Sequence, residues 1–153
     1  MDIKLDVDME GVNKMVEEEL NRVKLLTVRA LKRLGEESVT KAKDRPEAES
    51  WYNDTGNLRS SIGYTVTSGS EIEVLSAFTP VLNGSEGASI GKEFAEELAQ
   101  SEESEFALIV SAGMNYAGYV EAIDGKDVLK SAELLAREKW REYSRMLQQQ
   151  INE

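Results

Sequence analysis

The chain has 153 residues, of which 41% are hydrophobic, and this fits one compact domain (residues 1–153) with a single buried core. It contains no cysteine and no histidine, which excludes disulfides, thiolate nucleophiles and the commonest metal ligands. Its 29 acidic and 18 basic residues give a net charge of −11, which argues against clustered phosphate contacts. We therefore expect a protein that is not an enzyme and has no sequence-specific nucleic-acid binding.

Targeting and membrane signals are also missing from the sequence. The longest uninterrupted apolar run is Phe106–Val110, far too short to cross a bilayer. The first residues, Met1-Asp2-Ile3-Lys4, lack the basic start and apolar core of a secretion signal. We expect a protein that is made and kept in a cytosol and has no membrane partner.

A strand and a long helix are predicted at the start of the chain. Apolar and polar residues alternate over residues 3–7, the period of a half-buried strand. After Asp8, which can cap a helix, apolar residues recur in steps of three and four and predict a helix that reaches Lys43. Gly35 could end this helix and start another, and we favour one continuous helix. The predicted inward stripe is Val12, Val16, Leu20, Val23, Thr27, Leu31 and Leu34.

A short helix is predicted after a proline-containing connector at residues 44–53. Asp54 or Thr55 can cap it. Leu58 and Ile62 are four residues apart and therefore share its inner face.

Three further segments have the alternation of strands. Residues 64–67 and 72–78 flank the turn at residues 68–70, and another strand is predicted at residues 106–112. The last strand presents Phe106, Leu108 and Val110 on one face. Because the connections are local, the sheet should be antiparallel, with three or four strands.

Residues 79–105 form an insertion where a tight turn would have sufficed. We expect a loop with a short acidic helix, in which Phe94 and Leu98 point inward. After residue 113 one or two helical turns precede a break at residues 124–125, and a long helix begins near Asp127. Its stripe is Leu129, Ala132, Ala136, Trp140, Tyr143, Leu147 and Ile151.

Together these elements predict an α+β fold, in which long N-terminal and C-terminal helices pack on a small antiparallel sheet of three to four strands. The adjacent acidic pairs, such as residues 17–18 and 36–37, do not form a catalytic or metal site, because neighbouring helical side chains point about 100° apart. Ser60 and Ser61 have no histidine to activate them. We therefore predict no catalytic residue, no metal ligand and no cofactor.

Two segments carry a family resemblance. They are Asp54-Thr-Gly-Asn-Leu-Arg-Ser-Ser-Ile62, which a strand follows directly, and Asn115-Tyr-Ala-Gly-Tyr-Val-Glu121, which directly follows a strand. In this order, between two long helices, they resemble the HK97 gp10-like phage proteins, which are tail-completion and head–tail joining components. The order of elements matches over nearly the whole chain. The insertion at residues 79–105 and the stretch after Glu121 depart from the family pattern.

The residues of these segments have two readings that can hold together. They can be corners between helices and the sheet, with Glu121 as a partner for Arg59, or they can shape a subunit interface. The motif and candidate interface residues are Thr55, Gly56, Asn57, Leu58, Arg59, Ser60, Tyr116, Ala117, Tyr119, Val120 and Glu121.

The resemblance implies a structural virion protein, a tail-completion, neck or minor tail protein at the head–tail junction. Its partners would be its own copies in a ring and the neighbouring phage connector and tail proteins, and assembly would take place in the host bacterial cytoplasm. The alternative is a cytosolic or prophage-encoded helical adaptor that binds a protein partner and is not part of a virion.

Overall fold

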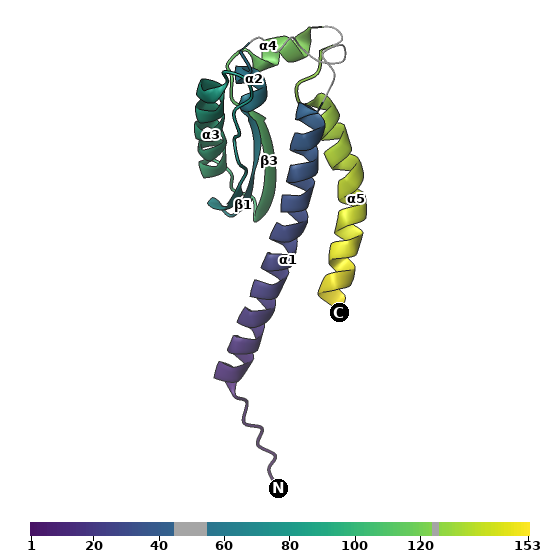
Figure 1. Cartoon of the computed structure of the whole chain (residues 1–153). Helices are drawn as coiled ribbons and strands as arrows, with labels where there is room; N and C mark the ends of the chain where they lie inside the picture. The colour runs from purple at the N-terminus through teal and green to yellow at the C-terminus, as the bar shows by residue number, and fades with distance from the viewer. Residues whose placement is uncertain (45–54, 124–125) are drawn as a thin grey trace.

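A computed structural model describes residues 1–44, 55–123 and 126–153 (Figure 1). Its fold is α+β, as predicted: a long N-terminal helix, α1 (Met9–Lys43), and a long C-terminal helix, α5 (Lys130–Asn152), accompany a three-stranded antiparallel sheet in the described residues. The sheet lies between α1 and a further helix, α3 (Ser85–Gln100), and α5 packs along α1 (Figure 1). Three predicted features lie outside the described residues: the connector beyond Asp44, the cap at Asp54, and the break at residues 124–125.

The beginning of the chain differs from the prediction in one respect. Residues 1–8 form no strand, so the strand predicted at residues 3–7 is wrong for the isolated chain. The reason is their position, because they leave the far end of α1 and point away from the sheet (Figure 1). Asp8 caps α1 as expected, with its side-chain Oδ1 accepting a hydrogen bond of 3.1 Å from the backbone N–H of Gly11.

Helix α1 is continuous through Gly35, as predicted, and a contact with the sheet explains why glycine is present there. A Cβ atom at this position would lie 2.5 Å from Cδ2 of Tyr64. The missing side chain thus lets the helix lie directly on the tyrosine ring, which is only 1% exposed. Tyr64 also donates a hydrogen bond of 2.6 Å from its hydroxyl to Glu36.

The sheet consists of β1 (Ile62–Ser68), β2 (Glu71–Leu75) and β3 (Phe106–Ala112), in the order β2-β1-β3. Gly69 makes the turn between β1 and β2 with a φ of 62°, a conformation that suits glycine. Two boundaries differ from the prediction. Ile62 belongs to β1, not to the preceding helix, because it pairs with Ala112 of β3, and Phe78 lies beyond the end of β2.

One face of the sheet is apolar and packs on α1. Tyr64 and Val66 of β1 form a cluster there with Leu31 of α1, and the predicted face of β3 joins it. The β3 residues in this cluster are Phe106, Leu108 and Val110. Since side chains alternate along a strand, Thr65 and Thr67, both fully buried, lie on the opposite face, which α3 covers.

Much of the insertion at residues 79–105 is the 16-residue helix α3. Its buried face consists of small residues: Gly87, Ala88, Gly91, Ala95 and Ala99. A Cβ atom on Gly91 would lie 2.5 Å from the carbonyl oxygen of Ser61, so this helix packs at very short range. The prediction that Phe94 points inward is wrong, since it is 36% exposed and a ring on the packing face would hold the helix away from the sheet.

Helix α5 is joined to α1 by polar contacts around Glu37. The Tyr143 hydroxyl donates a hydrogen bond to the Glu37 carboxylate, and the ammonium group of Lys139 lies 2.5 Å from Oε2. Burial disfavours the charged form of Glu37, but the hydrogen bonds from Lys139 and Tyr143 outweigh that effect and hold the pKa of this carboxyl below its usual value. In the described part of the chain, no helix is long and apolar enough to span a membrane.

Candidate assembly surface

The first motif segment surrounds the short helix α2 (Asn57–Ser60) and holds the start of α3 in place. Gly56 has a φ of 82°, and a Cβ atom there would lie 2.0 Å from the carbonyl oxygen of Val81. The side-chain oxygen of Asn57 accepts a hydrogen bond of 3.0 Å from the backbone N–H of Gly87 in α3. The Ser60 hydroxyl oxygen accepts one of 2.8 Å from the N–H of Val81. These residues therefore position the insertion.

The second motif segment contains α4 (Ala117–Ala122) and prepares the start of α5. The Glu121 carboxylate accepts hydrogen bonds from the backbone N–H groups of Val128, Leu129 and Lys130, at 2.8, 2.7 and 3.3 Å. A helix start leaves such N–H groups without partners, and an anion is favoured there. The predicted pairing of Glu121 with Arg59 is wrong, because these two described residues share no hydrogen bond or ion pair.

The two motif segments meet at one end of the sheet (Figure 1). Leu58 of α2 and Ala117 of α4 belong to one buried cluster, which also contains Ile62, and Val120 packs against it. The prediction that these segments are corners between the helices and the sheet is supported by this shared core. The buried motif residues, Gly56, Leu58, Ser60 and Ala117, thus hold the fold together and are not available to a partner.

A few motif residues do face outward. Thr55 is exposed, Tyr116 is 39% exposed and Tyr119 is 75% exposed, so these three could contact a neighbouring protein. Partial burial, with a smaller effect of the charge on Glu86, raises the pKa of Tyr116 and keeps its hydroxyl protonated. Arg59 is half-buried beside Lys43, whose pKa is lowered first by burial and then by the Arg59 charge.

A long series of exposed apolar residues lies elsewhere, on a part of the chain that the sequence pattern assigned to the core. We call residues 1–25 the projecting segment, because its outer part extends past the sheet and past α5 (Figure 1), while Arg22 and Lys24 near its base contact α5 and β2. The predicted inward stripe is buried only at Thr27, Leu31 and Leu34. The exposed apolar residues of the projecting segment are Met1, Ile3, Leu5, Val7, Met9, Val12, Met15, Val16, Leu20 and Leu25.

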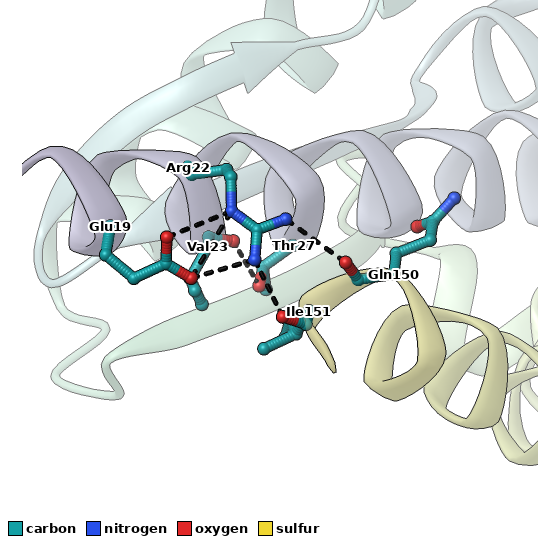
Figure 2. Close-up of polar contacts among 6 residues, drawn as sticks. All are labelled: Glu19, Arg22, Val23, Thr27, Gln150 and Ile151. Atoms are coloured by element: carbon teal, nitrogen blue, oxygen red, sulfur yellow. Dashed lines mark hydrogen bonds and ion pairs between the residues drawn. The ribbon is translucent and has the colours of Figure 1, made fainter. Parts of the chain in front are cut away.

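The base of the projecting segment is fixed by ion pairs and hydrogen bonds (Figure 2). The guanidinium group of Arg22 donates to the carbonyl oxygens of Gln150 and Ile151, at 3.1 and 2.7 Å, and to the Glu19 carboxylate at 2.8 Å. It thereby binds two carbonyl groups that the last turn of α5 leaves without helical partners. On the other side, the Lys24 ammonium group lies 2.7 Å from Glu73 of β2. The projection is therefore held at its base from two sides.

Two adjoining grooves run beside β3. The first, about 280 Å³, lies between α3, α4 and β3, and its lining includes Phe94 and Leu98 of α3, Val110 of β3 and Ala117 of α4. The second, also about 280 Å³, lies between β3 and the start of α5 and is lined mainly by Leu108, Val110, Ala132 and Ala136. Within the described residues β3 pairs with β1 alone, so the backbone of its other edge is free of a strand partner. We call the two grooves and this edge the β3 groove.

Neither the exposed stripe nor the β3 groove was predicted from the sequence. The signal for the stripe was present, because its apolar residues run for about four helical turns before the first residue that the fold buries.

Comparisons with protein-family models, with curated proteins and with solved structures find no match for this chain.

Proposed function

We propose that this protein is a structural subunit of a tailed-phage virion that joins head and tail. It would act as a tail-completion or neck protein, through ring self-assembly and contacts with neighbouring connector and tail proteins. The observation that carries the proposal is that the two family-like segments, far apart in the sequence, form adjacent corners around one core at the end of the sheet. If the two segments are motifs of one family fold, they should pack on one core, and they do.

The exposed apolar residues support an assembled state. Leu20 and Leu25 are 65% and 67% exposed on the same helix as Val16, and a monomer gains nothing from leaving such a surface in water. A ring of identical subunits would bury it against the next copy. The work of such a subunit is complementary surface alone, and its net charge of −11 suits a wall that DNA passes without binding.

The same surface supports one alternative function. A cytosolic or prophage-encoded adaptor would use the apolar stripe of α1 to bind one helix of a protein partner. It would form a defined complex of low order and would be absent from virions. The genes beside the coding sequence distinguish the two, since portal, capsid and tail-tube genes there favour the virion protein.

The deciding experiment is gold-antibody labelling of particles from the source phage or induced prophage, viewed by negative-stain electron microscopy. We expect gold where head meets tail. Antibody absorbed beforehand with the purified protein is the control and should leave the particles unlabelled. If intact particles, detached heads and detached tails all stay unlabelled while the lysate contains the antigen, the virion assignment is wrong and the adaptor is favoured.

A further inference from the structure

The first residues have the sequence of a strand but no strand beside them. Ile3, Leu5 and Val7 alternate with polar residues, and they are 89%, 86% and 59% exposed. A single extended segment gains stability only from pairing with a sheet edge and burying one of its faces. The missing partner must therefore come from a sheet elsewhere.

The β3 groove has the properties of a site for such a segment. The free edge of β3 offers unpaired backbone N–H and C=O groups, which an extended peptide can bind and a helix cannot. Apolar side chains line both sides of that edge: Phe94 and Leu98 on the α3 side, Leu108 and Ala136 on the α5 side. These are the surfaces that an added strand would cover.

The groove of the same chain is out of reach. The helix runs 18 residues from Met9 to Thr27, the first buried position, a distance of about 27 Å at the usual rise per residue. Ile3 is six residues from the start of the helix, and six extended residues span at most about 21 Å. Folding back, residues 3–7 would reach only their own projecting helix. A second molecule has to supply the groove.

We propose that residues 3–7 of one copy add a fourth strand to the sheet of a second copy, along the free edge of β3. This inference rests on the proposed ring assembly and names its contact. Each chain carries one donor segment and one acceptor groove on different surfaces, so the contact is head-to-tail and repeats from copy to copy until the ring closes. The hydrogen bonds from Arg22 to the end of α5 orient the part of α1 from which the donor leaves its own subunit.

Disulfide trapping tests the contact directly, because the chain contains no cysteine and each introduced thiol is the only one. Chains carrying Ile3→Cys, Leu5→Cys or Val7→Cys are mixed with chains carrying Leu108→Cys or Val110→Cys and oxidised. Side chains of paired residues on neighbouring strands lie close enough for a disulfide. We expect a mixed dimer in at least one combination, whose register then identifies the pairing.

Ile72→Cys on β2, the other free edge, is the matched control and should give no mixed dimer above that of Gln148→Cys on the exposed face of α5. Trapping at Ile72 in place of β3, or no trapping at any β3 position, overturns the proposal. In sedimentation experiments on the full chain, Leu5→Asp should weaken self-association about tenfold or more, and Lys4→Gln should leave it nearly unchanged. Equal self-association of both variants and the wild type also overturns it.

The outcomes for the two proposals are separable. Gold at the neck together with no trapping leaves the virion assignment standing and removes the strand exchange. Trapping at β3 in the purified protein, with unlabelled particles, establishes the exchange and removes the virion assignment.

Discussion

Replacing Gly35 by alanine tests whether α1 lies on the sheet at the spacing described. In an exposed helix interior, alanine is more favourable than glycine by about 1 kcal/mol. Here the new Cβ atom would lie 2.5 Å from Cδ2 and 2.7 Å from Cγ of Tyr64. Carbon atoms in good contact are about 3.5–4 Å apart, so ring and helix would have to separate by about 1 Å.

The tyrosine ring has little freedom to make that movement. Its hydroxyl is bonded to Glu36 at 2.6 Å, and its backbone N–H donates to the side-chain oxygen of Ser76 at 2.8 Å. Overpacking of a buried site costs about 1–3 kcal/mol, and a ring held at both ends belongs in the upper part of that range. After the gain in helix propensity is subtracted, Gly35→Ala should destabilise the protein by about 1–2 kcal/mol.

Urea unfolding followed by circular dichroism measures this difference. Gly118→Ala in α4 is the matched control, because a Cβ atom there meets nothing within 4 Å, and it should be neutral or stabilising by up to about 1 kcal/mol. If Gly35→Ala is at least as stable as the wild type while the control behaves as expected, α1 and the Tyr64 ring can separate at little cost in free energy. Close packing against the Tyr64 ring would then not be the reason for glycine at position 35.

Three further variants test the polar contacts. Glu121→Gln should cost about 1–2 kcal/mol in urea unfolding, because three N–H groups lose a charged acceptor, whereas Glu133→Gln in an exposed pair should change stability by less than about 0.5 kcal/mol. Because the pKa of Glu37 is lowered in the folded protein, its stabilising effect is present above the unfolded value of 4.5 and is lost as pH falls through the folded value. The difference in melting temperature between the wild type and Glu37→Gln should therefore shrink from pH 7 to pH 3. A difference that stays constant would contradict this role of Glu37. Arg22→Ala should speed amide hydrogen exchange in the last turn of α5 and leave β1 unaffected, and equal exchange in both would show that the contact does not hold that turn.

Features with a local period were predictable from the sequence. The alternation in β1 and β3 indicates which side of each strand is buried, so the α+β class and most boundaries follow. The predicted stripe of α5 is buried at Ala132, Tyr143 and Leu147, whereas the prediction for Trp140 is wrong, since its side chain is 38% exposed. The N-terminal end of α1 was also predictable, because Asp8 and its contact with Gly11 belong to one helical turn. These signals need no knowledge of distant residues.

The features that the sequence did not predict depend on distances between elements. Whether Phe94 or Ala95 faces the sheet is decided by how closely α3 approaches Thr65 and Thr67, and hydrophobicity favours the wrong residue. The role of Glu121 depends on the path of the chain from α4 to α5, which brings the N–H groups of Val128 and Leu129 to its carboxylate. The spacing of residues along the sequence predicts neither the packing face of α3 nor the position of the Glu121 carboxylate.

The failed predictions at the N-terminus carry information about assembly. The stripe of α1 continues with helical period back to Val12, and residues 3–7 continue with the period of a strand, although the fold of one chain buries neither. Each of the two adjacent segments has the apolar period that its own secondary structure needs in order to bury one face, and a segment that stays in water has no need of such a period. Both segments lie beyond the reach of their own sheet, which supports the proposal that they pack on another molecule. The pattern that misled the prediction for a single chain is thus the observation that most favours the proposed assembly.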